Sequence, residues 1–311
     1  MAAEIERMFS VREKPWHYEM TKDKTSIIQN ALTSAEALTA AGLDWTIEGR
    51  PIYDENCDEI PGFKANTRSS DGKVLGVVSD KYKVVQNKEA FDFTDSLIGN
   101  GLTYETAGSL RGGKTIWLLG KMPERYIAGD LTEPYIVFSN THDGTGAVRC
   151  AMTPIRVVCQ NTLNIALRNA NRAWSMIHRG DIMMKLDEAR QTLELADMYL
   201  AALDDEAQIL ADQKLTDGEM HDILDKLIPT EEDATDRQKK TIQETKDQII
   251  ICTLAPDLTK FLNTKWGFVN AVADFVDHGE PARKTKNWRE NRWGNIIGGH
   301  ELLDRAVALV R

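Results

Sequence analysis

The residues with the clearest capacity for chemistry are arginines in a segment that contains no acidic side chain. No Asp or Glu occurs between residues 144 and 180, so the guanidinium groups there must pair with distant carboxylates, with an outside anion, or with water. The arginines are Arg149, Arg156, Arg168, Arg172 and Arg179. Their planar groups suit phosphate, and Trp174 among them offers a ring on which a base can stack. The segment is a candidate for binding nucleic acid, and pairing with acidic helices of the same chain is the alternative.

A second candidate is the glycine turn Arg111-Gly112-Gly113-Lys114. Glycines expose backbone N–H groups, and with a cation on either side such a turn can cradle phosphate. The alternative is a plain hairpin turn whose glycines allow tight φ angles. The longer glycine patterns of nucleotide-binding proteins are absent from the sequence, so ATP-driven work is not expected. Together the candidate nucleic-acid-binding residues are Arg111, Lys114, Arg149, Arg156, Arg168, Arg172 and Trp174.

Two histidines stand next to carboxylates. His142-Asp143 could bind a divalent metal or act as a base, and His278 follows Asp277 at the expected end of a helix. We favour simpler roles, in which Asp143 and Asn140 satisfy turn backbone and His278 interacts with the helix dipole. Because no second histidine or cysteine nucleophile stands at a known spacing, we assign no catalytic residue, metal or cofactor. We favour a protein that is not an enzyme.

Basic and aromatic residues alternate near the end of the chain. This tail contains Arg283, Lys284, Lys286, Trp288, Arg289, Arg292 and Trp293. Such alternation fits single-stranded nucleic acid, because cations follow the backbone while rings stack on bases. The alternative is that both tryptophans dock the tail on the helical part of the protein, since tryptophan is largely buried on average.

Charge is distributed unevenly along the chain. The net charge of −10 divides into −6 over residues 1–61, +5 over 62–180, −13 over 181–280 and +4 over 281–311. A basic middle and tail beside an acidic helical part are expected if one face meets a polyanion. Solvated charged helices are the alternative.

Composition indicates a protein of the cytoplasm. The four cysteines form no Cys-x-x-Cys pair, so we expect reduced thiols and neither a zinc ribbon nor a redox dithiol. Residues 1–15 are charged and lack an apolar run, and nowhere do about 18 apolar residues follow one another. We therefore expect no signal peptide and no membrane partner.

Sequence patterning predicts an α+β fold, with an antiparallel, hairpin-rich N-terminal part packed with a helical C-terminal part. Strands are predicted at 45–53, 63–68, 74–78, 82–85, 104–110, 114–121, 134–139 and 147–153, with hairpin turns at 70–72, 111–113 and 140–146. Helices are predicted at 34–41, 88–98, 161–169, 217–228, 236–254, 265–276 and 301–310. A further helix of about 30 residues should start near residue 180. We divide the chain into residues 1–180, a β-rich core with two helices, and 181–311, a mainly helical region with a basic tail.

Several longer motifs resemble one known family. They are Pro15–His17, Ala41–Trp45, Tyr104–Gly113, Ser139–Gly144, Thr153–Asn164 and Trp266–Val272. These stretches extend over nearly the whole chain and resemble the phage/plasmid-like protein family, long catalogued as a domain of unknown function. The resemblance implies a home on phages, prophages and plasmids, and it brings no catalytic residues. Family members often read Trp-His-Gly-Leu-Gly near the start, whereas here Trp16-His17 is followed by Tyr18, so no role carries over to that turn.

Hypotheses from different functional classes remain open. In the first, the chain is a phage or plasmid protein that binds single-stranded DNA, of the annealing type that phages use in recombination, and forms homo-oligomeric rings or filaments. In the second, it is a metal-dependent enzyme acting on nucleic acid through His142, Asp143, Asp277 and His278. In a third, its acidic helices mimic DNA and inhibit a host defence protein. We predict the first.

Overall fold

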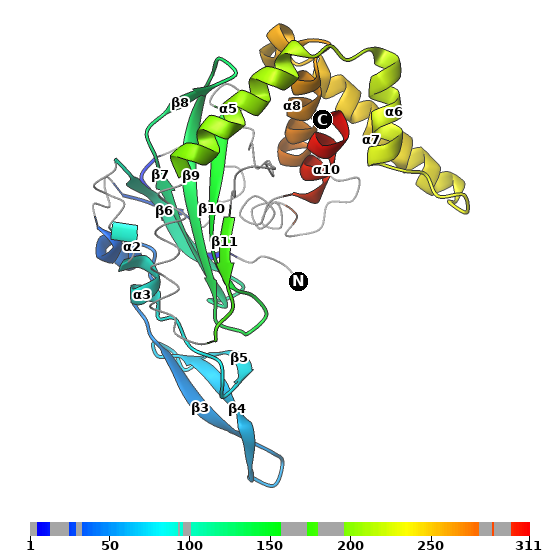
Figure 1. Ribbon diagram of the computed structural model, residues 1–311. Coiled ribbons are helices and arrows are strands. Elements are labelled where there is room, and N and C mark those ends of the chain that lie inside the picture. The colour runs from blue at the N-terminus through cyan, green and yellow to red at the C-terminus, as the bar shows by residue number, and fades with distance from the viewer. Residues whose placement is uncertain are drawn as a thin grey trace.

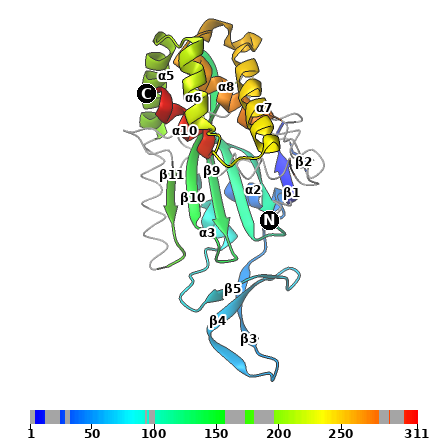
Figure 2. The ribbon, with the colours of Figure 1, turned by 90° about the vertical axis from the view of Figure 1, so that its right-hand side faces the viewer.

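The computed structural model describes residues 5–12, 25–28, 33–92, 94–95, 101–156, 173–179, 196–279, 288 and 300–311. Antiparallel strands occupy mostly the N-terminal half and helices the C-terminal half, which confirms the predicted α+β class. The helices of the C-terminal half gather at one end of a large sheet, and a small sheet projects from the opposite end (Figures 1 and 2).

The large sheet has eight strands in the order β11-β10-β9-β7-β6-β1-β2, with β8 paired to β9. Its strands are β1 (Ile5–Ser10), β2 (Thr25–Ile27), β6 (Thr103–Leu110), β7 (Thr115–Lys121), β8 (Arg125–Ile127), β9 (Asp130–Thr141), β10 (Val148–Arg156) and β11 (Ala173–Met176). All described pairs are antiparallel except β1 with β2. The two predicted hairpins β6–β7 and β9–β10 are confirmed and form the middle of this sheet.

Both faces of the large sheet are buried. Along β7, Ile116 and Leu118 belong to the main core, whereas Trp117 and Leu119 belong to a smaller cluster on the other face. This follows from the two-residue period of a strand. The main core continues from the sheet into the helical part, so both halves of the chain share one hydrophobic core.

Two short helices pack against the large sheet, and a bundle of longer helices lies at one end of it. Helices α2 (Ser34–Ala40) and α3 (Asn87–Asp92) lie against one face of the large sheet. The bundle consists of α5 (Ala196–Asp212), α6 (Asp217–Leu227), α7 (Asp236–Thr253), the 3-10 turn η2 (Pro256–Phe261), α8 (Lys265–His278) and α10 (Glu301–Val310). The helix predicted at residues 34–41 is confirmed as α2, and a capping box between Thr33 and Glu36 begins it.

The small sheet contains β3 (Ile47–Tyr53), β4 (Glu59–Arg68) and β5 (Val74–Ser79) in that order. Residues of β4 near Arg68 are buried, but most of β3 and the first half of β4 are exposed on both sides. We call this projecting sheet the arm, and its base rests on the end of the large sheet (Figure 1). The predicted turn at residues 70–72 connects β4 to β5, and Gly72 there has a φ of +70°.

One predicted strand is wrong, and others were not predicted. Residues 82–85 form no strand, because Tyr82 is held by its own side chain: its hydroxyl donates to the backbone oxygen of Thr141 at 2.6 Å. Strands β1 and β11 pair with segments that are distant along the chain, which no local pattern indicated. Strand β8 has only three residues and pairs with the start of β9 in a tight hairpin, too short for an alternating pattern to show. The predicted helix at 161–169 and residues 180–195 of the predicted long helix lie outside the described residues, and α5 represents its later part.

Among the described residues, no helix combines the length and apolar character that a membrane crossing requires.

Candidate nucleic-acid interface

Two hairpin turns meet where the arm rests on the large sheet. The β6–β7 turn carries Arg111 and Lys114, and Arg111 adopts a positive φ of 56°. The β4–β5 turn carries Lys73, whose Nζ lies so close to Gly112 that a Cβ atom built there would be 2.1 Å away. The two hairpins belong to different sheets, and together they bring three cations to one end of the large sheet. We call Lys73, Arg111 and Lys114 the turn patch.

The turn patch differs from the neighbouring cation Arg68 in its pairing. Arg68 lies 2.8 Å from Glu6 and 2.6 Å from Asp71, and its hydrogen bond lowers the pKa of Asp71 to about 2. Lys73 lies near both carboxylates without pairing to them. In the described part of the chain, no turn-patch side chain forms an ion pair, and Nε of Arg111 is buried without a hydrogen-bond partner. Lys73 is exposed, Arg111 and Lys114 are half-buried, and none of the three is held in an ion pair with a described residue.

The other predicted nucleic-acid-binding residues are dispersed. Arg149 stands near the start of β10, at the same end of the sheet as the turn patch. Position 156 ends β10 and pairs with Thr132 at the opposite end of the sheet. Trp174 is half-buried and packs against the main core. Arg168 and Arg172 lie outside the described residues.

His142 lies in the interior between the arm and the large sheet. It is fully buried, and its Nε2 atom lies 3.0 Å from Oδ1 of Asn87. Its ring meets Trp45 edge-on at 5.6 Å, and its backbone oxygen accepts a 2.8 Å hydrogen bond from Asn66. Burial, with a smaller effect of His178, lowers the pKa of His142 to about 3. The imidazole is therefore neutral at physiological pH and positions the loop that follows it.

Asp143 and Asn140 make different contacts. Oδ1 of Asp143 accepts hydrogen bonds from the backbone N–H and the hydroxyl of Thr145, at 3.0 and 2.7 Å, as predicted for a turn. Asn140 instead donates to the backbone oxygen of Val85 at 3.1 Å, in a neighbouring segment. The loop is thus fixed both internally and to the chain beside it.

A cavity of about 610 Å³ lies next to this loop, where the arm joins the large sheet. Its walls come from the end of β5, from Tyr82, from residues 143–146 and from the segment 177–179 after β11. The rings of Tyr82 and His178 stack at 4.5 Å, and the backbone N–H of Lys83 donates to His178 at 2.9 Å. We call this cavity the joint pocket. Its volume is in the range of small-ligand sites.

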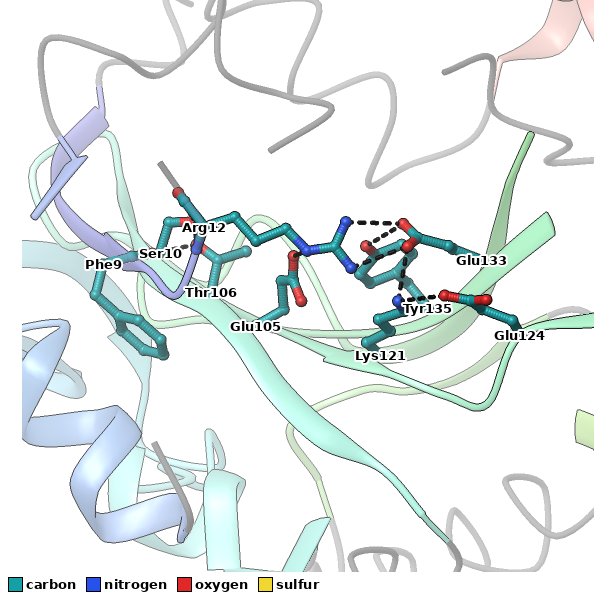
Figure 3. Close-up of polar contacts among 9 residues, drawn as sticks. All are labelled: Phe9, Ser10, Arg12, Glu105, Thr106, Lys121, Glu124, Glu133 and Tyr135. Carbon is teal, nitrogen blue, oxygen red and sulfur yellow. Dashed lines mark hydrogen bonds and ion pairs between the residues drawn. The ribbon is translucent and has the colours of Figure 1, made fainter. Parts of the chain in front are cut away.

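A second polar cluster lies on the large sheet, on the face that carries Trp117 (Figure 3). Arg12, which follows β1, reaches across the strands so that its Nε is 2.6 Å from Glu105 and its Nη2 is 2.9 Å from Glu133. Lys121 pairs with Glu133 at 2.7 Å, and the Tyr135 hydroxyl donates to the same carboxylate at 3.0 Å. The contacts fasten β1 to the middle of the sheet.

The two carboxylates of this cluster have opposite pKa shifts. Burial raises the pKa of Glu105, which is 3% exposed. Burial also opposes ionisation of Glu133, but hydrogen bonds from Arg12 and Lys121 lower its pKa overall. Opposite shifts occur in acid–base sites. Here, however, the charged groups bind one another, so the arrangement supports a structural role.

The histidine–carboxylate pairs named as possible metal ligands are far apart. His142 and Asp143 belong to the loop beside the arm, whereas Asp277 and His278 end α8 in the helical bundle at the other end of the molecule (Figure 1). Within the described ranges, no three His, Cys, Asp or Glu side chains lie together in a way that could hold a metal ion.

The model of one protein family, described as a domain of unknown function (DUF932), matches residues 74–294. The matched range covers more than two-thirds of the chain. The chain belongs to the DUF932 family. No curated protein and no solved structure matches it. The DUF932 range contains Arg111, Lys114 and the whole joint pocket, whereas Lys73 and strands β3 and β4 of the arm precede it.

Sequence reasoning missed several residues near this candidate site of the DUF932 chain. Lys73 follows the predicted turn at 70–72, and Lys81 and Lys83 flank Tyr82, so a Lys–aromatic–Lys pattern was present in the sequence. All three lysines are exposed and, among the described residues, none forms an ion pair. Glu105 gave no comparable signal, because a register shift in β6 between Tyr104 and Thr106 decides where it lies.

Proposed function

We propose that this protein binds single-stranded DNA and that the turn patch contacts the phosphate backbone. The supporting observation is the contrast in pairing: Lys73, Arg111 and Lys114 form no ion pair in the described structure, although Lys73 lies near Glu6 and Asp71. Arg12, Arg68 and Lys121 are held in ion pairs. Cations that are free to neutralise phosphates release counterions from DNA, which drives association. Arg149, at the same end of the sheet, is a candidate for a further contact.

The biological setting belongs to the same proposal. The resemblance to phage and plasmid proteins suggests that DNA binding serves strand annealing during recombination, in the cytoplasm of a host cell. A homo-oligomer, as a ring or a filament, would align many turn patches along one strand. Several patches on one strand would raise the overall affinity above that of a single protomer.

A metal-dependent enzyme receives less support from the geometry. His142 is fully buried and its pKa is low, so its ring does not reach a substrate from its present position. The acidic bundle lies at the other end of the molecule from the turn patch (Figure 1). An inhibitor that mimics DNA would therefore use the bundle rather than the turn patch, and it would not bind DNA.

The test is a titration of a fluorescent single-stranded oligonucleotide at several salt concentrations. A duplex of the same sequence is titrated in parallel. Affinity of the unchanged protein should fall steeply as salt rises and should be higher for the single strand. The triple variant Lys73→Ala/Arg111→Ala/Lys114→Ala should bind more weakly. Each lost phosphate contact should reduce the slope of log affinity against log salt by about 0.7.

The matched control removes exposed positive charge from the helical bundle. Arg237→Ala/Lys239→Ala changes two exposed cations on α7, at the other end of the molecule from the arm (Figure 1). This variant should keep the affinity and the salt slope of the unchanged protein. If the triple variant has the same affinity and salt slope as the unchanged protein, the proposal is contradicted. If the unchanged protein binds no DNA at all, the proposal is wrong and the inhibitor hypothesis takes its place.

A further inference from the structure

A backbone hydrogen bond connects the joint pocket to the turn patch. The N–H of His142 donates to the backbone oxygen of Lys114 at 2.8 Å, and His142 directly precedes the loop that lines the pocket. A nucleic-acid strand that contacts Lys114 with its phosphates therefore passes close to the pocket. Lys81 and Lys83, which flank the lining residue Tyr82, provide further exposed cations there.

The walls of the pocket expose apolar side chains. Val77 of β5 is 54% exposed and Ile177 after β11 is 61% exposed, and both line the cavity. Exposed aliphatic groups on a cavity wall suit a ligand with a flat apolar face, because its binding removes their surface from water. Nucleobases have such faces and stack without regard to sequence.

One acceptor in the pocket is left for a ligand. Asp143 uses Oδ1 for the two hydrogen bonds from Thr145, and Oδ2 has no hydrogen-bond partner among the described residues. A carboxylate accepts hydrogen bonds and repels phosphate. The group that approaches Asp143 should therefore be a hydrogen-bond donor, and in DNA the exocyclic amino group of a base is such a donor.

The pocket is held in shape without a ligand. The loop touches β5 so closely that a Cβ atom on Gly76 would lie 2.5 Å from Cα of Asp143. Tyr82 binds the backbone oxygen of Thr141 at 2.6 Å, and Nδ1 of His178 lies 3.0 Å from the backbone oxygen of Lys83. Walls that are fixed in advance lower the entropic cost of binding.

We infer that the joint pocket takes one unpaired nucleobase that carries an exocyclic amino group, with Asp143 as the acceptor and Val77 and Ile177 against the ring. The inference rests on the proposed binding of single-stranded DNA and adds a base preference to it. Cytosine presents an amino donor to the pocket. Thymine has no exocyclic amino group, and its N3–H donor stands between two carbonyl oxygens, which the carboxylate repels.

The test compares oligo-dC with oligo-dT of equal length. The unchanged protein should bind oligo-dC about fivefold or more tightly, as expected for one good contact to a base edge. Asp143→Asn should reduce this ratio to about one, because the neutral amide both donates and accepts. The matched control Asp80→Asn removes the same charge from an exposed residue that does not line the pocket, and it should keep the preference.

The outcomes separate this inference from the function on which it rests. If both strands bind equally with a normal salt slope, or if Asp143→Asn keeps the preference for oligo-dC, the base site is wrong and DNA binding stands. If neither strand binds, both proposals are wrong. An equal loss of preference in Asp80→Asn would assign the effect to charge alone and would also overturn the base site.

Discussion

The Nε2 atom of His142 lies 3.0 Å from Oδ1 of Asn87, in an interior that water does not reach. Asn87 in turn donates from Nδ2 to the backbone oxygen of Leu43 at 2.8 Å. These contacts join the β9–β10 loop, the start of α3 and the segment before β3. The imidazole is therefore part of the joint between the arm and the large sheet.

Acid should destabilise the protein through His142. Its pKa is about 3 in the folded protein and about 6.5 when unfolded, so the unfolded chain binds the proton first as pH falls. The contribution of His142 to the free energy of unfolding is then fully present above pH 6.5. It declines toward pH 3 by about 1.4 kcal/mol per pH unit. Between pH 7 and pH 5 we expect a loss of about 2 kcal/mol from this residue. Urea unfolding at the two pH values measures it.

The control for this prediction is His142→Gln, which cannot titrate. It should be less stable at pH 7, because the new side chain fits the site less well, and its stability should depend less on pH. His178, whose pKa burial also lowers, should account for part of the remaining dependence. An identical pH slope in the variant and the unchanged protein would show that His142 is not the responsible group.

Replacing Arg12 should destabilise the protein more than replacing its partner Glu105. Arg12→Ala leaves Glu105 buried without its partner, and we expect a loss of about 2 kcal/mol, below the 3–5 typical of fully buried pairs because Arg12 is 36% exposed. Glu105→Gln keeps the shape and removes the buried charge, so it should cost less than about 1 kcal/mol. Chemical denaturation of both variants measures the difference.

A double-mutant cycle checks the cause. Arg12→Ala/Glu105→Gln should be more stable than Arg12→Ala alone, since no uncompensated charge remains. If Arg12→Ala costs nothing, β1 is not fastened by this cluster. If the double variant is no more stable than Arg12→Ala, the loss comes from the contact of Arg12 with Glu133.

Two glycines should respond oppositely to the same substitution. Gly76→Ala would place a methyl group 2.5 Å from the backbone of Asp143, so the loop and β5 must separate, at a cost of about 1–3 kcal/mol. Gly218→Ala, in the first turn of α6, meets nothing within 4 Å and should stabilise by about 0.5 kcal/mol. Thermal unfolding of both variants measures the contrast, and equal effects would argue against the tight joint.

Much of the local structure could be predicted from the residues alone. The Arg111–Gly113 turn, the capping box at Thr33 and the helix at 301–310 follow from glycine torsions, hydroxyl caps and apolar spacing, all of which act within a few residues.

The sequence by itself determined which side chains are cationic and which turns and helices carry them, because those properties depend on neighbours along the chain. Only the tertiary structure decided which cations are neutralised. Arg68 meets Glu6, 62 residues away, and Arg12 meets Glu133, 121 residues away, while Lys73 is brought against Gly112 with no pairing carboxylate among the described residues. Such contacts arise from strand order and register, which no short stretch of sequence encodes.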